Sequence, residues 1–422
     1  MTESRGGHRR ATNRSGPSAL RGPLILAAIV ATVIGLLAGA PNATADNVAL
    51  PTPLRDRFYD APPNLASLAP GEIIATRDRP NPPGFFDVRT YQLAFRSSDS
   101  QGEPIAAVTT VLVPTRKTAD GPLLSFQHII NATGLECAPS QALWTQDPNL
   151  AIREAPGLNV ALQQGWAVAI PDHLGPRSAY GAAKLGGQIT LDNIRAVKDF
   201  GPAKSADSPI GLAGYSGGGM ATAWAAALAP TYAPDLDIAG AAYGGVPMNL
   251  LKMAEGLGYS TPHPAFGLAF AAAIGVSREY PKQIPMWQHL SPLGKQMYLG
   301  MRNACTNDIL RLGAGHDAQQ VTVGGRAIFD DPVARRVVEQ NSLSLYRGIP
   351  RTPIFEWHSP TDALIPVSSI DHTLDRYCRA GLPVERMSTP SPDHLSAALI
   401  GLLPAFRYLQ DRFQGVPAPS SC

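Results

Sequence analysis

From Leu123 to the C-terminus, short apolar runs alternate with stretches of helical periodicity, and this alternation limits the fold more than any other feature. A buried apolar strand followed by a crossover helix is typical of a parallel sheet with helices on both faces. The expected strands are 123–130, 166–170, 210–215, 238–243, 354–357 and 384–389. The expected helices are 189–200, 220–228, 367–380 and 395–412. We therefore predict an α/β fold with a mostly parallel central sheet.

Two further strands are expected at the start of the sheet. Residues 85–96 and 105–113 alternate between apolar and polar side chains, and residues 97–102 are typical of a turn, so we predict a hairpin. Residues 46–83 are rich in Pro, Asn and Asp, which indicates an irregular N-terminal arm on the surface. The sheet is thus expected to begin after residue 84.

Residues 247–347 interrupt the alternation. Helical pieces such as 266–273 and 333–346 occur there without an obvious strand. An insertion of this size is most simply a helical cap over the edge of the sheet where strand ends converge, which is where ligands bind. The predicted core is therefore 84–246 and 348–422, with a cap insertion at 247–347.

The first 45 residues have the order of an export signal peptide. Five arginines precede an apolar run at 24–40, and Ala43-Thr44-Ala45 follows before Asp46. We expect cleavage after Ala45 and a secreted or cell-envelope protein. An uncleaved membrane anchor stays open, because about 17 apolar residues are near the shortest span of a bilayer. The Arg9-Arg10 pair also leaves a twin-arginine route open.

The cysteines and the overall charge restrict what the chain can bind. Four cysteines in an exported chain favour two disulfides, and three pairings are possible. We expect Cys137 with Cys305 and Cys378 with Cys422, since the second pair would pin the C-terminal tail. No motif typical of a metal or redox centre occurs, so we predict no metal and no cofactor. The formal net charge of +2 is too small for an electrostatic grip on nucleic acid.

A candidate nucleophile follows the expected strand 210–215. Ser216 lies in Gly214-Tyr215-Ser216-Gly217-Gly218, and Gly-x-Ser-x-Gly alone is weak because glycine is common here. The strand before it and the small-residue helix after it supply the setting that such a turn needs. Glycines on either side let strand and helix pass without collision, and the N–H of Gly217 lies where it can stabilise an oxyanion. An inert serine in a glycine-rich turn is the alternative.

A serine nucleophile needs a base and an orienting acid, which in this kind of fold follow it in the order acid, histidine. His394 lies in the loop before the last expected helix, and Asp362 lies in a loop after the strand 354–357. We predict the triad Ser216, Asp362 and His394. Capping or turn roles are the alternatives for both residues. The remaining rivals are His358, His372, Glu356 and Asp393, and none is preferred.

With these motifs the sequence resembles the secretory lipase family, which consists of cap-bearing α/β-hydrolases and includes the fungal lipase A type. The resemblance covers about residues 50–412 and rests on the following segments: Leu135-Glu136-Cys137-Ala138-Pro139-Ser140, Asp172-His173-Leu174-Gly175, Leu191-Asp192-Asn193-Ile194-Arg195, the Ser216 motif, the Asp362 loop and Asp393-His394-Leu395-Ser396. It implies an α/β-hydrolase fold, triacylglycerol lipase or carboxylesterase activity without a cofactor, an acyl tunnel in the cap, and transient contact with lipid surfaces.

Two departures from the family pattern matter. Fungal members carry an aspartate in the loop after the third strand, where this chain has Asn131, whose amide donates a hydrogen bond at any pH. We expect Asn131 to be a second oxyanion donor. An Asx-turn or a glycosylated Asn131-Ala132-Thr133 sequon is the alternative. The tail beyond Phe413 is short, so we expect a C-terminal flap like that of the fungal members to be missing or reduced.

The same triad would also serve an acyltransferase or a serine peptidase, and a catalytically inert exported binding protein is the alternative of a different class. Asp172 and His173 also follow a strand. They precede Ser216 in the chain, so we interpret them as structural.

Overall fold

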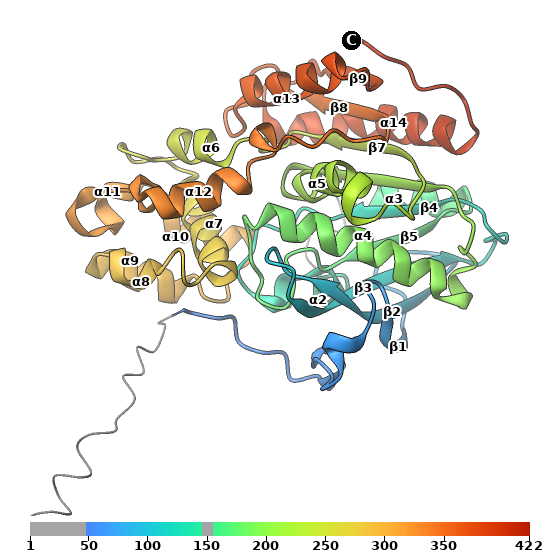
Figure 1. Ribbon diagram of the computed structural model, residues 1–422, viewed down its shortest axis with the longest axis horizontal. Helices are drawn as coiled ribbons and strands as arrows, with labels where there is room; N and C mark the ends of the chain where they lie inside the picture. The colour runs from blue at the N-terminus through green and yellow to red at the C-terminus, as the bar shows by residue number, and fades with distance from the viewer. Residues whose placement is uncertain (1–47, 146–154) are drawn as a thin grey trace, which may run out of the picture. The chain divides into compact units, whose positions relative to one another are not determined.

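The computed structural model describes residues 48–145 and 155–422, and its centre is a nine-stranded sheet in the order β1-β2-β3-β5-β4-β6-β7-β8-β9 (Figure 1). The strands are β1 (Ile73–Arg79), β2 (Val88–Ser98), β3 (Pro104–Pro114), β4 (Leu123–Gln127), β5 (Ala167–Pro171), β6 (Ile210–Tyr215), β7 (Ile238–Gly244), β8 (Ile354–His358) and β9 (Val384–Ser388). Pairing is antiparallel from β1 to β3 and between β3 and β5. It is parallel from β5 through β9, as predicted.

The prediction of an irregular arm is wrong for residues 73–79, which form β1. This strand pairs antiparallel with β2, so the sheet begins one strand earlier than expected. The strand is half-buried to exposed at the sheet's edge, and it carries Thr76, Arg77, Asp78 and Arg79. An edge strand with charged side chains lacks the apolar alternation from which strands are predicted.

Helices cover both faces of the sheet (Figure 1). On one face α4 (Ala183–Asp199), α5 (Ser216–Tyr232) and α13 (Val367–Arg379) share an apolar core with the strands. On the other face α3 (Ala155–Gln163) and α14 (His394–Phe413) share a second core. The short helix α2 (Pro139–Ala142) also contributes to that core. The arrangement of an α/β fold with helices on both faces is therefore as predicted.

Between β7 and β8 the chain forms helices and two isolated bridges but no further strand of the sheet. The α-helices are α6 (Leu250–Gly256), α7 (Phe266–Glu279), α8 (Met286–His289), α9 (Pro292–Gly300), α10 (Thr306–Gly313), α11 (Ala318–Val321) and α12 (Pro332–Gln340). Most of them bury side chains in a core of their own, which also takes in Ile130 and Leu174 from loops after strands of the sheet. The helical segment is thus attached to the carboxyl edge of the sheet.

Both expected disulfides are present, Cys137–Cys305 and Cys378–Cys422. The second one ties the C-terminal residue to α13, as its prediction supposed. The expected export signal at 1–45 lies outside the described residues. Among the residues described, the structure contains no helix that is both long and apolar enough to cross a membrane.

Candidate active site

Ser216 stands on a sharp turn between β6 and α5. Its φ of 54° is in the left-handed region, which is strained for a residue with a side chain. A Cβ at Gly214 would lie 2.5 Å from Thr222 Oγ1, and one at Gly218 would lie 2.0 Å from the carbonyl oxygen of Gln127. The close passage of strand and helix therefore requires glycine at both positions, as predicted from the motif.

His394 and Asp362 are joined by a hydrogen bond of 2.6 Å between Nδ1 and Oδ2. The other carboxylate oxygen of Asp362 accepts the backbone N–H groups of Leu364 and Ile365, each at 2.9 Å. Burial by itself raises the pKa of Asp362, but the bond to His394 and the two N–H bonds outweigh it, so the pKa is lowered. The carboxylate is thus ionised at neutral pH and fixed beside the imidazole.

Ser216 and His394 line the same cavity. The second imidazole nitrogen, Nε2, is buried and has no hydrogen-bond partner among the residues described. Catalytic hydrogen bonds are often unmade in a protein without substrate, and a serine side chain reorients about one bond. The unpaired Nε2 is therefore the nitrogen that is free to take a proton from Ser216.

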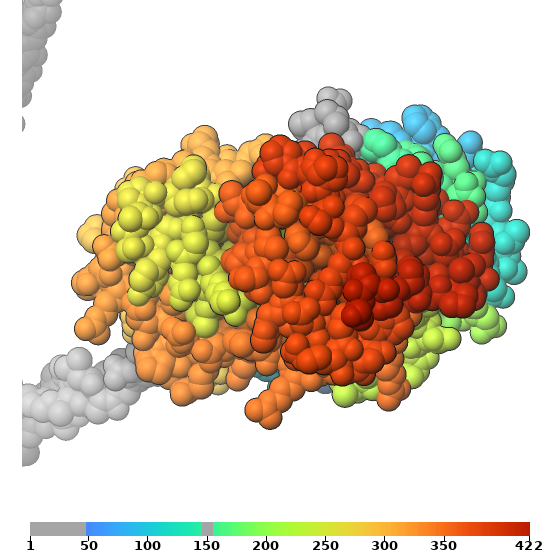
Figure 2. All heavy atoms as spheres, turned by 90° about the horizontal axis from the view of Figure 1, so that it is seen from above, coloured from blue at the N-terminus to red at the C-terminus, as the bar shows by residue number. Residues whose placement is uncertain are grey.

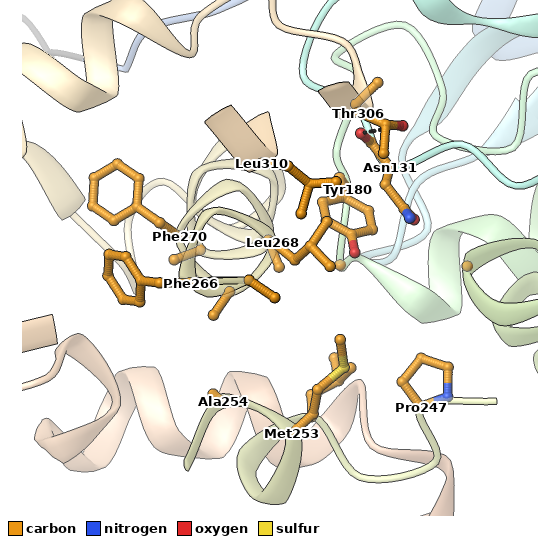
Figure 3. A pocket seen from close by; sticks show the side chains of 18 of the residues that line it. Asn131, Tyr180, Pro247, Met253, Ala254, Phe266, Leu268, Phe270, Thr306 and Leu310 are labelled. Atoms are coloured by element: carbon orange, nitrogen blue, oxygen red, sulfur yellow. Dashed lines mark hydrogen bonds between the residues drawn. The ribbon is translucent and has the colours of Figure 1, made fainter. Parts of the chain in front are cut away.

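Gly217 and Asn131 lie against each other beside the nucleophile. Gly217 follows Ser216 in the first turn of α5, and a Cβ on it would lie 2.6 Å from Asn131 Oδ1. That oxygen is buried and has no hydrogen-bond partner within residues 48–145 and 155–422. The backbone carbonyl of Asn131 accepts a hydrogen bond from Thr306 Oγ1 at 3.1 Å (Figure 3). The helical segment thus holds the Asn131 loop in place. Asn131 lines the cavity and its Oδ1 is buried, which favours the oxyanion role over a glycosylated surface position.

A cavity of about 890 Å³ begins at these residues and extends into the helical segment. Figure 3 shows Phe266, Leu268 and Phe270 of α7 along it, with Met253 of α6 on the opposite side. Ser216, Asn131 and His394 are among the polar residues of the lining, and most of the other lining residues are apolar. The site therefore combines the candidate reactive residues with a mostly apolar lining. Among the residues described, no cluster of His, Cys, Asp or Glu could hold a metal ion.

Comparison with known proteins agrees with this geometry. The family model described as secretory lipase matches residues 153–421. The chain belongs to the secretory lipase family. Lipase A of Moesziomyces aphidis is 30% identical over 94% of this chain and 88% of its own, and a secreted triacylglycerol lipase of Malassezia globosa is 30% identical over 87% and 81%. The crystal structure of Candida antarctica lipase A in its closed state superimposes with a TM-score of 0.82 at 29% identity, covering 89% of each chain.

These matches confirm the predicted resemblance, the α/β-hydrolase fold and the ester hydrolase class of the enzyme. They also support an exported protein with a lipid ester as substrate. In this secretory lipase the carboxyl ends of β6, β8 and β9 lie at one edge of the sheet. Ser216 and His394 therefore line one cavity and Asp362 is bonded to His394, although 178 positions separate Ser216 from His394.

The rival residues of this secretory lipase have other partners. Asp393 caps α14 by accepting the N–H groups of Leu395 and Ser396. Glu356 is fully buried and hydrogen-bonded to His358 Nδ1 at 2.8 Å. His372 is exposed on α13. Asp172 accepts the N–H of Ser140 at 2.9 Å, which fits its structural interpretation.

Three side chains that hold His394 and Asp362 in place were not predicted from the sequence. Tyr215 donates a 2.6 Å hydrogen bond to the backbone carbonyl of His394, and the two rings lie 5.0 Å apart. Ser359 Oγ donates to the carbonyl of Ser391 at 2.7 Å, and Thr361 Oγ1 donates to that of Pro392 at 3.2 Å. These last two bonds join the acid loop to the histidine loop. A hydroxyl in a loop carries no signal in the sequence that distinguishes such a role.

Proposed function

We propose that Ser216, His394 and Asp362 hydrolyse lipid esters through an acyl-enzyme. Ser216 Oγ attacks the ester carbonyl carbon while its proton passes to His394 Nε2. The bond from that carbon to the alcohol oxygen then breaks, and the alcohol leaves with the proton from Nε2. Water repeats the sequence on the acyl-enzyme, which releases the acid and restores Ser216.

The observation that carries this proposal is the arrangement of His394. Its Nδ1 is bonded to a buried carboxylate, whereas its Nε2 is buried, unpaired and on the same cavity as Ser216. Asp362 accordingly keeps the proton on Nδ1 and stabilises the imidazolium that forms. The base is thus prepared at the atom that faces the nucleophile.

The N–H of Gly217 and the amide of Asn131 are the proposed oxyanion donors. Oδ1 is the atom near Gly217, so Nδ2 faces the oxyanion only after a half-turn of the amide, which costs little because Oδ1 has no partner. A neutral amide needs no protonation in order to donate. Donation by Asn131 is therefore independent of pH.

We further propose that residues 247–347 act as a cap whose cavity takes the acyl chain. The volume of about 890 Å³ lies within the range of about 300–1,000 Å³ typical of small-molecule sites. Triacylglycerols and other carboxylic esters with an apolar acyl group fit such a lining.

We also propose that the chain is exported and that its leader is cleaved after Ala45. N-terminal sequencing of the secreted chain tests this proposal.

The decisive experiment is labelling with a fluorophosphonate probe together with hydrolysis of p-nitrophenyl esters. The wild-type chain is expected to be labelled at one serine and to hydrolyse the esters, and Ser216→Ala is expected to lose both. His394→Ala is expected to lose hydrolysis, whereas His372→Ala, which changes an exposed histidine, keeps it. Undiminished hydrolysis by Ser216→Ala would refute the proposal.

A further inference from the structure

The outer face of α14 carries large apolar side chains that no part of the described chain covers fully. Leu395, Leu399 and Leu403 are 59%, 57% and 53% exposed, and Ile400 is 40% exposed. The three leucines are four residues apart and so lie on one side of the helix. We call Leu395, Leu399, Ile400 and Leu403 the α14 stripe.

The composition of α14 makes this face unusual for a surface helix. Its inner face buries Ala397, Ala398, Gly401 and Ala405 against the sheet. From Leu395 to Phe406 the only polar side chain is that of Ser396, which is about 18 Å of helix without a charge. A helix that is apolar on all sides is normally buried, so an exposed face such as the α14 stripe calls for an explanation.

The α14 stripe is continuous with the active-site cavity. Leu395 follows His394 directly and lines the same cavity, although more than half of it faces solvent. A partner that covers the stripe therefore reaches the mouth of the cavity. Figure 2 shows that the C-terminal part of the chain, in orange-red and red, forms much of the face seen in that view.

A small second hollow lies under the same helix. It holds about 80 Å³ and is lined by apolar residues, among them Leu158 of α3 and Leu399, Leu402 and Phe406 of α14. No charged side chain of the described residues lines it. An apolar ligand could therefore contact both the α14 stripe and the hollow beneath the helix.

We propose that the α14 stripe docks the enzyme on the surface of aggregated neutral ester lipids, and this rests on the proposed function. The stripe has no cationic residue to attract an anionic surface, and its apolar contact begins where substrate must enter. A second copy of the chain on this face would cover Leu395 and obstruct the mouth of the cavity. A lipid surface instead brings the ester to it.

The test compares Leu399→Glu/Leu403→Glu with Leu299→Glu, which changes a leucine of α9 that is 56% exposed and does not line the cavity. Binding to triacylglycerol droplets is measured in the Ser216→Ala background, where no turnover occurs. The double variant is expected to bind about 100-fold more weakly, about tenfold for each leucine, and added salt is expected to have little effect. Leu299→Glu is expected to bind like the parent chain.

Activity separates this proposal from the function on which it rests. With Ser216 present, the double variant is expected to hydrolyse a soluble short-chain ester at the wild-type rate and emulsified triacylglycerol at least tenfold more slowly. Unchanged droplet binding by the double variant overturns the docking proposal. An equal loss in Leu299→Glu overturns it too, as does a wild-type dimer that the double variant dissociates. A wild-type chain that hydrolyses no soluble ester refutes the proposed function instead.

Discussion

Replacing Asp362 by asparagine is expected to disable the base while the local structure is kept. One oxygen of Asp362 accepts two backbone N–H groups at 2.9 Å, and an amide oxygen is the only part of asparagine that can replace it. The amide NH₂ is therefore placed where Oδ2 now meets His394 Nδ1 at 2.6 Å. It donates to Nδ1, so the proton of the neutral imidazole moves to Nε2.

An imidazole that already carries its proton on Nε2 cannot accept one from Ser216. The loss expected for Asp362→Asn is about 10⁴-fold in kcat, which corresponds to about 5.5 kcal/mol in the activation barrier. KM for a soluble ester should change little, because Asp362 does not line the cavity in which the substrate binds. The variant is thus expected to bind substrate normally but to hold the imidazole proton of His394 on the wrong nitrogen.

The assay is steady-state hydrolysis of a soluble ester by Asp362→Asn, Asp362→Ala and the wild-type chain, with thermal unfolding to verify folding. Alanine removes the carboxylate but does not force the proton onto Nε2. We therefore expect Asp362→Ala to keep at least as much activity as Asp362→Asn. If the asparagine variant is clearly the more active of two equally folded proteins, the assignment of the tautomer is wrong.

Three further changes have definite expected outcomes. Gly217→Ala places a Cβ 2.6 Å from Asn131 Oδ1, so kcat and the rate of fluorophosphonate labelling should both fall by about 10²–10³. Cys378→Ser opens a disulfide that spans 44 residues, which should cost up to about 4 kcal/mol in denaturant unfolding while activity is kept, because that disulfide does not line the cavity. Burial raises the pKa of Asp172 from 3.8 to about 7, so the folded chain holds this proton more tightly and the free energy of unfolding falls between about pH 4 and pH 7. Asp172→Asn should remove that part of the decline.

The central part of the fold could be predicted because its strands are buried. Strand β6 has the predicted bounds, and Gly214 and Gly218 are required because a Cβ on either would lie 2.5 Å or less from a neighbouring atom. The order and loop positions of Asp362 and His394 follow from strand ends, since parallel strands present their carboxyl ends at one edge. Buried strands, close-contact glycines and residues at strand ends can all be recognised from the pattern and order of residues in the sequence.

The helical segment between β7 and β8 was predicted less well because polar side chains are buried there. Helix α7 was expected over 266–273 but continues to Glu279. Arg278 and Glu279 are each only 1% exposed. Arg278 donates to several carbonyl oxygens, among them those of Ala49 and Thr133, and Glu279 accepts the N–H of Ser100. In the sequence, charged residues after an apolar run are normally taken to mark the end of a buried helix. The backbone groups that satisfy Arg278 and Glu279 are distant in the chain, so the sequence does not show that these residues continue α7.

The proposed base and the proposed docking surface belong to one helix. His394 is the first residue of α14, and Asp393 caps the helix through Leu395 and Ser396. The next residue, Leu395, begins the α14 stripe, so no loop separates the stripe from the imidazole. If α14 docks on lipid as we propose, its orientation against the lipid therefore also sets the orientation of His394. The proposed acyl-binding part lies in a different segment, α6 to α12.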